Sequence, residues 1–399
     1  MQTIEQTRAQ RIIAPQGQCP VCGSAAVITL LEIDQVPVLC NVLWPTRTAA
    51  LNAPKGDIQL GFCQDCGHLF NRAFNAALME YAQDYENSLH FSPRFQSYAE
   101  ALAMRLIQRY GLRGKDIIEI GCGKGDFLRL MCVLGGNRGV GFDPSYESKL
   151  GVENDTITII QDFYSTQYTD YAADAVICRH VLEHIEFPRR FLLNVRESIG
   201  DRLEAMVYFE VPNATYTLRD MGIWDLIYEH YSYFSTSSLS RLFTACGFGV
   251  RDLAEAFQGQ FLGIEAKPLK RMSRSASKSD LQELSRHAAA FAERYHSKVE
   301  HWRQTLRELA GQHVVIWGGG SKGVTFLNIL QTQGQIAYAV DINPRKQGKY
   351  IAGTGQQLVA PEFLSRYQPD IVLIMNPVYE LEIQQILASL GLAPELMIV

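Results

Sequence analysis

The chain of 399 residues lacks a long apolar run. No stretch approaches the roughly 20 consecutive apolar residues that span a bilayer, and the polar start MQTIEQTRAQR has no apolar secretory core. It also lacks an excess of positive charge. The net charge is -5 and the pI is near 6.0, so a general attraction to phosphate backbones is not expected. We therefore predict a cytoplasmic protein with no membrane partner and no nucleic-acid partner.

Repeats of solenoid period are absent as well, and nine cysteines without an export signal do not predict a disulfide framework. What the sequence does contain is 47% hydrophobic and 20% charged residues, which is typical of a globular protein. A chain of this length exceeds one ordinary hydrophobic core. We expect two or three domains, with cysteines that are buried or bound to metal.

Different sequence patterns divide the chain into four parts. Residues 1–78 carry two cysteine pairs and little helical periodicity, as small metal-stapled modules do. Residues 79–268 alternate amphipathic stretches with the short apolar runs DIIEI, GVGFD, ITIIQ, DAVICR, AMVYFEV and FLGIEA, which predicts a mostly parallel sheet covered by helices. Residues 269–310 hold a basic, serine-rich linker and a long helix, and residues 311–399 form a second, smaller α/β lobe. The predicted fold class is α/β.

Two C-x-x-C-G turns, CPVCG and CQDCG, mark the first part of the chain. Each turn brings two sulfurs together, and its glycine lets backbone N–H groups reach the thiolates. A redox C-x-x-C would open a helix after a strand, whereas this context is a proline-rich loop. Cys40 and His68 lie nearby, and we predict that neither binds the metal. The predicted ligands of a structural zinc ion are Cys19, Cys22, Cys63 and Cys66.

A glycine-rich turn follows the first predicted strand of the middle part, in DIIEIGCGKGDFL. Its glycines let the backbone pass close to a ligand, and the turn opens onto the N–H groups of a helix. An acidic residue ends each of the next two strands. The first is suited to bind ribose hydroxyls, and the second, together with the phenylalanine after it, is suited to the edge and face of adenine. The residues predicted to bind an adenosine-containing cofactor are Glu119, Gly121, Gly123, Gly125, Asp143, Asp162 and Phe163.

Two features of this turn favour S-adenosylmethionine over a dinucleotide. The third glycine of G-x-G-x-x-G is missing, and the acidic Glu119 precedes the turn. The E-x-G-x-G-x-G pattern is similar to motif I of the class I methyltransferases. This resemblance implies a Rossmann-like methyltransferase lobe.

The segment ICRHVLEHIEFP matches the H-x-x-E-H pattern of inverted zinc peptidases. On a helix, His180 and His184 would share one face. The segment directly follows the strand DAVIC, however, and VLEHI is a common continuation of a methyltransferase lobe, so we do not favour a peptidase. The loop after this strand borders the methyl donor in such folds. His184 is therefore a candidate site residue, and simple packing or capping is the alternative.

Taken together, these parts resemble the three-domain sugar C-methyltransferases. The cysteine quartet, the glycine turn, EHYSYFS after the fifth strand and the terminal GSKG and VDINPRKQG segments carry the resemblance. That family combines an N-terminal zinc-binding module, a class I methyltransferase lobe and a C-terminal Rossmann-like lobe. It methylates a carbon of nucleotide-linked 4-keto-deoxysugars. The resemblance implies S-adenosylmethionine and structural zinc as cofactors and a nucleotide sugar as substrate.

The resemblance also implies a catalytic cluster. The family's Glu-His pair matches Glu229 and His230, with His230 as the base, and the histidine after the fourth strand matches His184. A tyrosine before the methyltransferase lobe matches Tyr85. The family usually has Tyr-x-Glu-His, whereas Tyr228 adjoins Glu229 directly, so the role of this tyrosine is open. The alternative for IYEHYSYFS is plain aromatic core with a surface Glu-His pair.

The segment VVIWGGGSKGVTFLN in the last part fits a strand, a G-x-G-x-x-G turn and a helix. Alone it is a dinucleotide fingerprint, so an NAD-dependent oxidoreductase is the alternative function. The resemblance instead implies that this lobe holds the nucleotide of the substrate; the predicted residues are Lys322, Arg345 and Lys346. A further alternative is that this lobe binds no ligand. A zinc-ribbon nucleic-acid methyltransferase is a third possibility and would need a local basic face.

Overall fold

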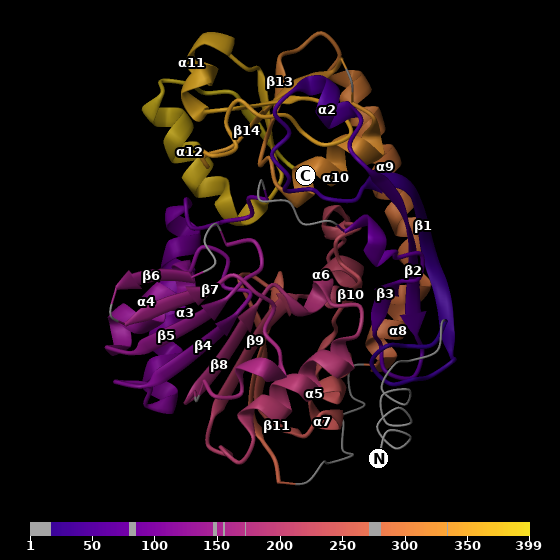
Figure 1. Cartoon of the computed structure of the whole chain (residues 1–399). Helices are drawn as coiled ribbons and strands as arrows, with labels where there is room; N and C mark the ends of the chain where they lie inside the picture. The colour runs from indigo at the N-terminus through magenta and orange to yellow at the C-terminus, as the bar shows by residue number, and fades with distance from the viewer. Residues whose placement is uncertain are drawn as a thin grey trace.

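The structure is a computed structural model that describes residues 17–79, 85–146, 150–154, 156–171, 173–270, 281–332 and 334–399, with the backbone alone for 150–154. The strands in this part of the chain form sheets of four, eight and five strands (Figure 1). Residues 271–280, which make up most of the predicted linker, lie outside the described residues. The fold class is α/β, as predicted.

The eight-stranded sheet has the order β11-β12-β9-β8-β4-β5-β7-β6. Its strands are β4 (Asp116–Ile120), β5 (Arg138–Phe142), β6 (Leu150–Asn154), β7 (Ile157–Ile160), β8 (Ala175–Arg179), β9 (Met206–Pro212), β11 (Phe248–Ala256) and β12 (Phe261–Pro268). From β9 to β7 neighbouring strands are parallel, while β12, β11 and β6 pair antiparallel. The six predicted strands are confirmed. We did not predict β11, whose half-exposed, charged sequence lacks the continuous apolar run of a buried strand.

Helices cover both faces of this sheet: α3 (Pro93–Tyr110), α4 (Asp126–Gly135), α5 (Pro188–Ile199) and α7 (Thr236–Ala245). Successive residues of a strand point to opposite faces. Ile117 accordingly joins the buried cluster that contains α3 and α4, whereas Ile118 joins the cluster that contains α5 and α7. Apolar side chains on both faces explain the continuous hydrophobic runs of the central strands.

The four-stranded sheet is antiparallel and combines distant parts of the chain. Its strands are β1 (Val27–Pro37), β2 (Lys55–Cys63), β3 (Leu69–Asn71) and β10 (Ser232–Tyr233). The short β10 comes from the IYEHYSYFS segment, and its Ser232 pairs with Phe70 of β3. This pairing fixes the backbone just after His230 against the N-terminal part of the chain.

The five-stranded sheet is parallel throughout, in the order β15-β14-β13-β16-β17. Its strands are β13 (Val314–Trp317), β14 (Ile336–Val340), β15 (Gln357–Val359), β16 (Ile371–Ile374) and β17 (Glu395–Ile398), and its helices are α10 (Ser321–Leu330), α11 (Leu364–Tyr367) and α12 (Glu380–Ser389). The N-terminal helix α2 (Arg47–Leu51) lies beside this lobe (Figure 1), where Gly353 N donates to Ala50 O at 2.8 Å.

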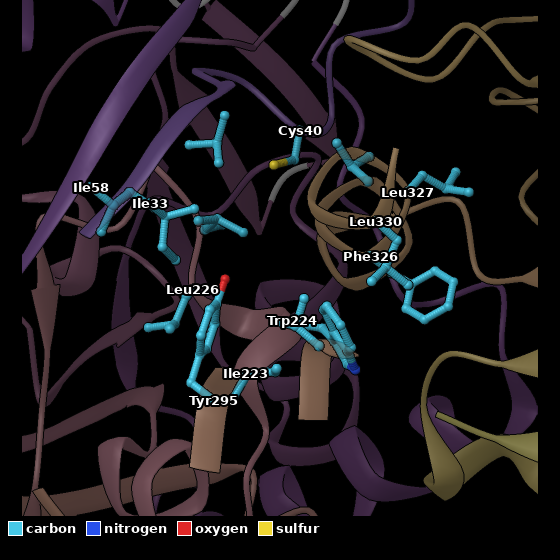
Figure 2. Packing of buried hydrophobic residues seen from close by; sticks show 14 of the residues in the cluster. Ile33, Cys40, Ile58, Ile223, Trp224, Leu226, Tyr295, Phe326, Leu327 and Leu330 are labelled. Atoms are coloured by element: carbon cyan, nitrogen blue, oxygen red, sulfur yellow. The ribbon is translucent and has the colours of Figure 1, made fainter. Parts of the chain in front are cut away.

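The predicted long helix is two helices, α8 (Leu281–Ala289) and α9 (Phe291–Glu308), which meet at Ala290. They belong to a buried cluster that unites β1, the segment around Trp224 and α10. Trp224 packs edge-on against Phe326 with ring centroids 5.0 Å apart (Figure 2). Because one hydrophobic core crosses the ranges 1–78, 79–268 and 311–399, their division into domains stays a prediction.

Among the described residues, no helix is both long enough and apolar enough to cross a membrane. The short helix α6 (Ala214–Arg219) and the 3-10 turn η4 (Ile223–Asp225) follow β9 and lead to Glu229 and His230. A second 3-10 turn, η3 (Leu182–His184), follows β8. Both segments therefore start at the carboxyl end of neighbouring parallel strands, which is the edge where open α/β sheets bind ligands.

Candidate active site

The glycine turn between β4 and α4 has a left-handed backbone at its three glycines. Gly121, Gly123 and Gly125 have φ angles of 68°, 55° and 81°, in the left-handed region that favours glycine. A Cβ atom on Gly121 would lie 2.1 Å from Val181 Cγ2, so no larger residue fits there. Gly125, at the N-cap of α4, has no side chain that could cap the helix. The turn is a tight backbone bend at the N-terminus of α4, a position that favours an anionic or hydroxyl-bearing ligand.

Two acidic side chains flank this turn. Glu119 is buried, and its Oε2 has no hydrogen-bond partner among the described residues. Burial raises the pKa of Glu119 to about 8. Asp143 Oδ2 accepts a hydrogen bond from Gly123 N at 2.7 Å and Oδ1 accepts one from Ser145 N at 2.9 Å. A carboxylate has about four acceptor positions, so Asp143 is fixed in place and still has room for a ligand hydroxyl.

Asp162 and Phe163 follow the end of β7, on the same edge of the sheet. Asp162 Oδ2 accepts a hydrogen bond from the Tyr168 hydroxyl at 2.5 Å, which lowers the pKa of Asp162. The Phe163 side chain is 65% exposed, so its ring is free to stack on a ligand. A buried carboxyl oxygen without a partner among the described residues, a glycine turn and an exposed aromatic ring fit an adenosine-containing cofactor.

His184 and His230 form a pair at the adjoining part of this edge. Their ring centroids are 5.0 Å apart, with an angle of 72° between the ring planes. His184 Nδ1 lies 2.9 Å from the backbone oxygen of Glu229. Because a carbonyl oxygen can only accept, Nδ1 carries the proton and Nε2 keeps its lone pair. A backbone contact between residues 45 positions apart thus orients the His184 ring.

His230 is held in its neutral form. Burial lowers the pKa of His230 well below its ordinary value, and the nearby His184 and His180 lower it further. Its Nδ1 is buried and has no hydrogen-bond partner among the described residues. A neutral imidazole with an available lone pair can accept a proton at neutral pH.

The Glu229 carboxyl group contacts other residues than its neighbour His230. It is fully buried, its Oε2 accepts a hydrogen bond from the Tyr85 hydroxyl at 2.5 Å, and its Oε1 accepts one from Cys40 N. Burial raises the pKa of Glu229. The side chain of Glu229 therefore positions Tyr85, while its backbone positions His184.

Tyr228 contacts the N-terminal part of the chain. Its hydroxyl accepts a hydrogen bond from Asn75 N at 2.8 Å, and its ring stacks on Phe74 with centroids 5.5 Å apart. The side chain is 1% exposed and fills the space above Gly56. These contacts favour a packing role for Tyr228, and its catalytic role stays a prediction.

A buried ionic network at the ends of β8 and β9 was missed by sequence reasoning. Arg179 Nη2 lies 2.8 Å and His180 Nε2 lies 3.1 Å from Glu210 Oε1. His180 has the unusual φ of 55°. Although burial opposes its charge, hydrogen bonds to Glu183 and Glu210 raise the pKa of His180 to about 9. The acidic residue within the apolar run AMVYFEV could have indicated this network, because a buried carboxylate needs a partner.

The H-x-x-E-H match does not have the geometry of a peptidase site. Its residues lie in a 3-10 turn, and the backbone of His180 is left-handed just before it, so His180 and His184 do not share one face of an α-helix. The side chains that approach one another are instead Glu183, His184 and His230, whose ligand-type atoms all lie within 4.8 Å.

The three predicted nucleotide-binding cations contact earlier parts of the chain. Lys322 Nζ lies 3.0 Å from Asp225 Oδ2 and 2.8 Å from Gln260 Oε1. Arg345 Nη1 lies 3.0 Å from Glu86 Oε2. Lys346 Nζ lies 3.3 Å from Asn41 Oδ1. The structure thus brings these cations to the boundary between the last lobe and the rest of the chain, where each has a polar or acidic partner.

The cysteine quartet converges in space. Cys19 Sγ lies 3.6 Å from Cys66 Sγ, Cys22 Sγ lies 3.6 Å from Cys63 Sγ, and all four sulfurs lie within 4.8 Å of one another. A tetrahedron with Zn–S bonds of about 2.3 Å has sulfurs about 3.8 Å apart, so four thiolates at these positions fit a zinc ion. His68 is not part of the quartet and lies 3.2 Å from Ser232 Oγ through its Nε2.

Comparison with known proteins defines the class of the chain. Residues 95–253 match the methyltransferase domain family, and residues 264–392 match the C-methyltransferase C-terminal domain family. The chain is an S-adenosylmethionine-dependent C-methyltransferase. The second match includes the glycine turn from Gly318 to Gly323, so this turn is part of a C-methyltransferase domain and does not support an oxidoreductase.

A full-length relative gives the same class. The chain is 24% identical over 396 residues to the C-methyltransferase NovU of Streptomyces niveus, covering 94% of this chain and 93% of that protein. Solved structures that resemble part of the chain include the magnesium protoporphyrin IX methyltransferase ChlM of Synechocystis PCC 6803 with bound SAH, at 14% identity and a TM-score of 0.35, covering 46% of this chain and 90% of ChlM. Another is the N,N-8-amino-8-demethyl-D-riboflavin dimethyltransferase RosA of Streptomyces davawensis, at 20% identity and a TM-score of 0.33, covering 43% and 54%.

Proposed function

We propose that the protein methylates a carbon next to the ketone of a nucleotide-linked keto-deoxysugar. The observation that carries this proposal is the pair of His184 and His230, in which His230 is neutral and His184 has a fixed tautomer. A carbon acid needs a base of this kind, whereas oxygen and nitrogen acceptors already have lone pairs. The resemblance to the sugar C-methyltransferases supplies the substrate class.

His230 acts as the base in this proposal. It takes a proton from the carbon next to the ketone, the C–H electron pair forms a carbon–carbon double bond, and the carbonyl electrons move to oxygen to give an enolate. General base catalysis of this kind typically contributes about 10²- to 10⁴-fold. S-adenosylmethionine, when bound, supplies an electrophilic methyl group for the enolate carbon and leaves as S-adenosylhomocysteine. The proton on His230 then passes to solvent.

Tyr85 stabilises the enolate oxygen. In the resting arrangement its hydroxyl donates to Glu229 Oε2. Because burial raises the pKa of Glu229, this carboxyl can hold a proton and donate it to the tyrosine oxygen. Tyr85 O–H can then donate to the enolate, as donors that stabilise a developing oxyanion do. His184 borders the reacting carbon and has its Nε2 lone pair available as a second proton acceptor.

The remaining predicted residues hold the ligands. Glu119, Asp143, Asp162, Phe163 and the glycine turn bind the cofactor. Lys322, Arg345 and Lys346 exchange their present partners for substrate phosphates at the boundary of the last lobe. The four cysteines hold a structural zinc ion that fixes the loops beside β2 and β3.

A panel of nucleotides and nucleotide-linked keto-sugars tests the substrate class. The expected result is a rise in melting temperature with one member of the panel, and transfer of labelled methyl from S-adenosylmethionine to a carbon of that compound. Methylation of only an oxygen or nitrogen acceptor, or of nucleic acid, would contradict the proposal. Binding that weakens steeply with salt would identify a nucleic-acid substrate.

A further inference from the structure

Glu183 is a buried carboxyl group with an incomplete set of partners. It lies in η3 with 1% of its surface exposed. Its Oε1 is 3.7 Å from His180 Nδ1, and its Oε2 is buried without a hydrogen-bond partner among the described residues. A buried carboxylate oxygen that lacks a donor is costly and rare. Its presence beside the two histidines calls for a donor that arrives during the reaction or shares its proton with this oxygen.

His230 carries the nitrogen atom that can serve as the missing donor for Glu183. Its Nδ1 is also buried and has no partner in the part of the chain that the structure describes, and the ligand-type atoms of Glu183, His184 and His230 lie within 4.8 Å of one another. His184 cannot supply its Nδ1 proton, because that proton is donated to Glu229 O. Of the two imidazoles, His230 is therefore the one that needs an acceptor.

We propose that Glu183 is a positioning residue for His230. Its carboxylate holds the neutral ring with the proton on Nδ1, which leaves the Nε2 lone pair for the substrate, and it balances the charge that the ring acquires with a substrate proton. This inference rests on the proposed function, in which His230 is the base.

The surroundings of His230 make a carboxylate necessary. His180 and His184 both disfavour a positive charge on this ring, and the ring of Tyr233 from β10 lies 5.7 Å away as a neutral contact. The Glu229 carboxyl is occupied by Tyr85 and Cys40. Glu210 is occupied by Arg179 and His180. Among these three described carboxylates, Glu183 has a buried oxygen without a hydrogen-bond partner.

The first test measures the tautomer of His230 in the protein without substrate, by ¹⁵N NMR of labelled histidines. Assignment comes from the signal that is missing in His230→Asn. The wild-type protein and Glu183→Asp, which keeps the charge, should have the proton on Nδ1. Glu183→Gln should give a mixture of tautomers, and the exposed Glu197 on α5 provides a matched control, Glu197→Gln, with no change. A proton on Nε2 in the wild-type protein would overturn the proposal.

The second test measures exchange of the substrate C–H with deuterated solvent as a function of pH. Glu183→Gln should slow exchange roughly 10- to 100-fold, within the range of general base catalysis, and S-adenosylhomocysteine affinity should stay within about twofold since the cofactor residues are untouched. In Glu183→Gln the acidic limb of the pH profile of exchange should move to lower pH, because the protonated His230 ring has lost its counter-ion. An unchanged rate and profile would overturn the proposal.

A divalent cation on Glu183, His184 and His230 is the competing explanation, because two imidazoles and a carboxylate form a common metal site. Activity that is lost with EDTA while the cysteine-bound zinc is retained, and that returns with Mn²⁺ or Zn²⁺, would overturn the positioning role. If the wild-type protein exchanges no proton of any keto-sugar, the proposed function fails; the tautomer measurement still decides the role of Glu183.

Discussion

His184 Nδ1 donates a hydrogen bond to the backbone oxygen of Glu229 at 2.9 Å. This contact joins the segment after β8 to the segment after β9, and it orients one imidazole while the neighbouring His230 approaches it. A backbone acceptor is insensitive to the side chain of residue 229. The two functions of Glu229, orienting His184 and holding Tyr85, are therefore separable by mutation.

Glu229→Gln tests this separation. The substitution keeps the backbone contact to His184 and an acceptor for Cys40 N, but it removes the ionisable group that binds Tyr85. We expect methyl transfer to fall roughly 10- to 100-fold, since enolate stabilisation is a large catalytic contribution, while the cofactor Kd stays nearly constant. Steady-state kinetics and calorimetric titration measure the two quantities. Wild-type turnover in this variant would exclude a role of the carboxyl group in catalysis.

Tyr228→Phe is the matched control in the neighbouring residue. The hydroxyl of Tyr228 contacts the backbone of Asn75, which caps the 3-10 turn Ala76–Leu78. Its removal should cost about 1 kcal/mol of unfolding free energy, the usual value of one hydrogen bond, and leave kcat unchanged. Urea denaturation and kinetics measure both. A large loss of kcat at unchanged stability would place Tyr228 in the catalytic cluster.

The pH dependence of activity follows from the lowered pKa of His230. An ordinary histidine loses its base form below about pH 6.5, whereas His230 should stay neutral there. We therefore expect kcat/KM for proton exchange to hold its plateau below pH 6.5 and to fall only at the lower native pKa. An acidic limb at or above pH 6.5 would contradict the assignment of His230 as the base.

The same shift predicts a stability effect. Below about pH 6.5 the unfolded chain protonates this histidine while the folded protein does not, so the unfolding free energy decreases as pH falls from about 6.5 toward the lower native pKa. His230→Asn should make this decrease shallower. Denaturant titrations of both proteins at pH 7.5 and pH 5 measure the difference. Equal slopes would mean that His230 titrates normally in the folded protein.

Zinc removal tests the cysteine quartet. The purified protein should contain one zinc ion per chain, and Cys63→Ser should lose it together with a marked fall in melting temperature, because a structural metal contributes folding free energy. Cys132→Ala, at a buried cysteine outside the quartet, should keep the zinc. Zinc analysis by mass spectrometry distinguishes the two variants. Full zinc content in Cys63→Ser would contradict the proposed site.

Local features of the chain were predictable from sequence. The strand that carries Glu119, the glycine turn and α4 are contiguous, so their order alone indicates a ligand-binding turn. The same logic identified the second glycine turn, and the two share a geometry: Asp143 accepts from Gly123 N, and Asp341 accepts from Gly319 N at 3.1 Å.

Long-range features were not predictable. Tyr228 and Glu229 are adjacent, yet one packs on Phe74 and the other binds Tyr85, because β10 pairs with β3 and fixes the direction of each side chain. The Glu210 network depends in the same way on the register between β8 and β9. Sequence reasoning identifies the residue types of such a site, but tertiary pairing decides which of them meet.

Solvent-deuterium exchange in His230→Asn tests the central claim most directly. The experiment incubates the protein with the nucleotide-linked keto-sugar that it methylates, in deuterated buffer, with S-adenosylhomocysteine in place of the methyl donor. We predict that the wild-type protein exchanges the proton at the methylated carbon, and that His230→Asn abolishes both exchange and methyl transfer while binding S-adenosylhomocysteine with nearly unchanged affinity. Exchange at the wild-type rate in His230→Asn would contradict the account.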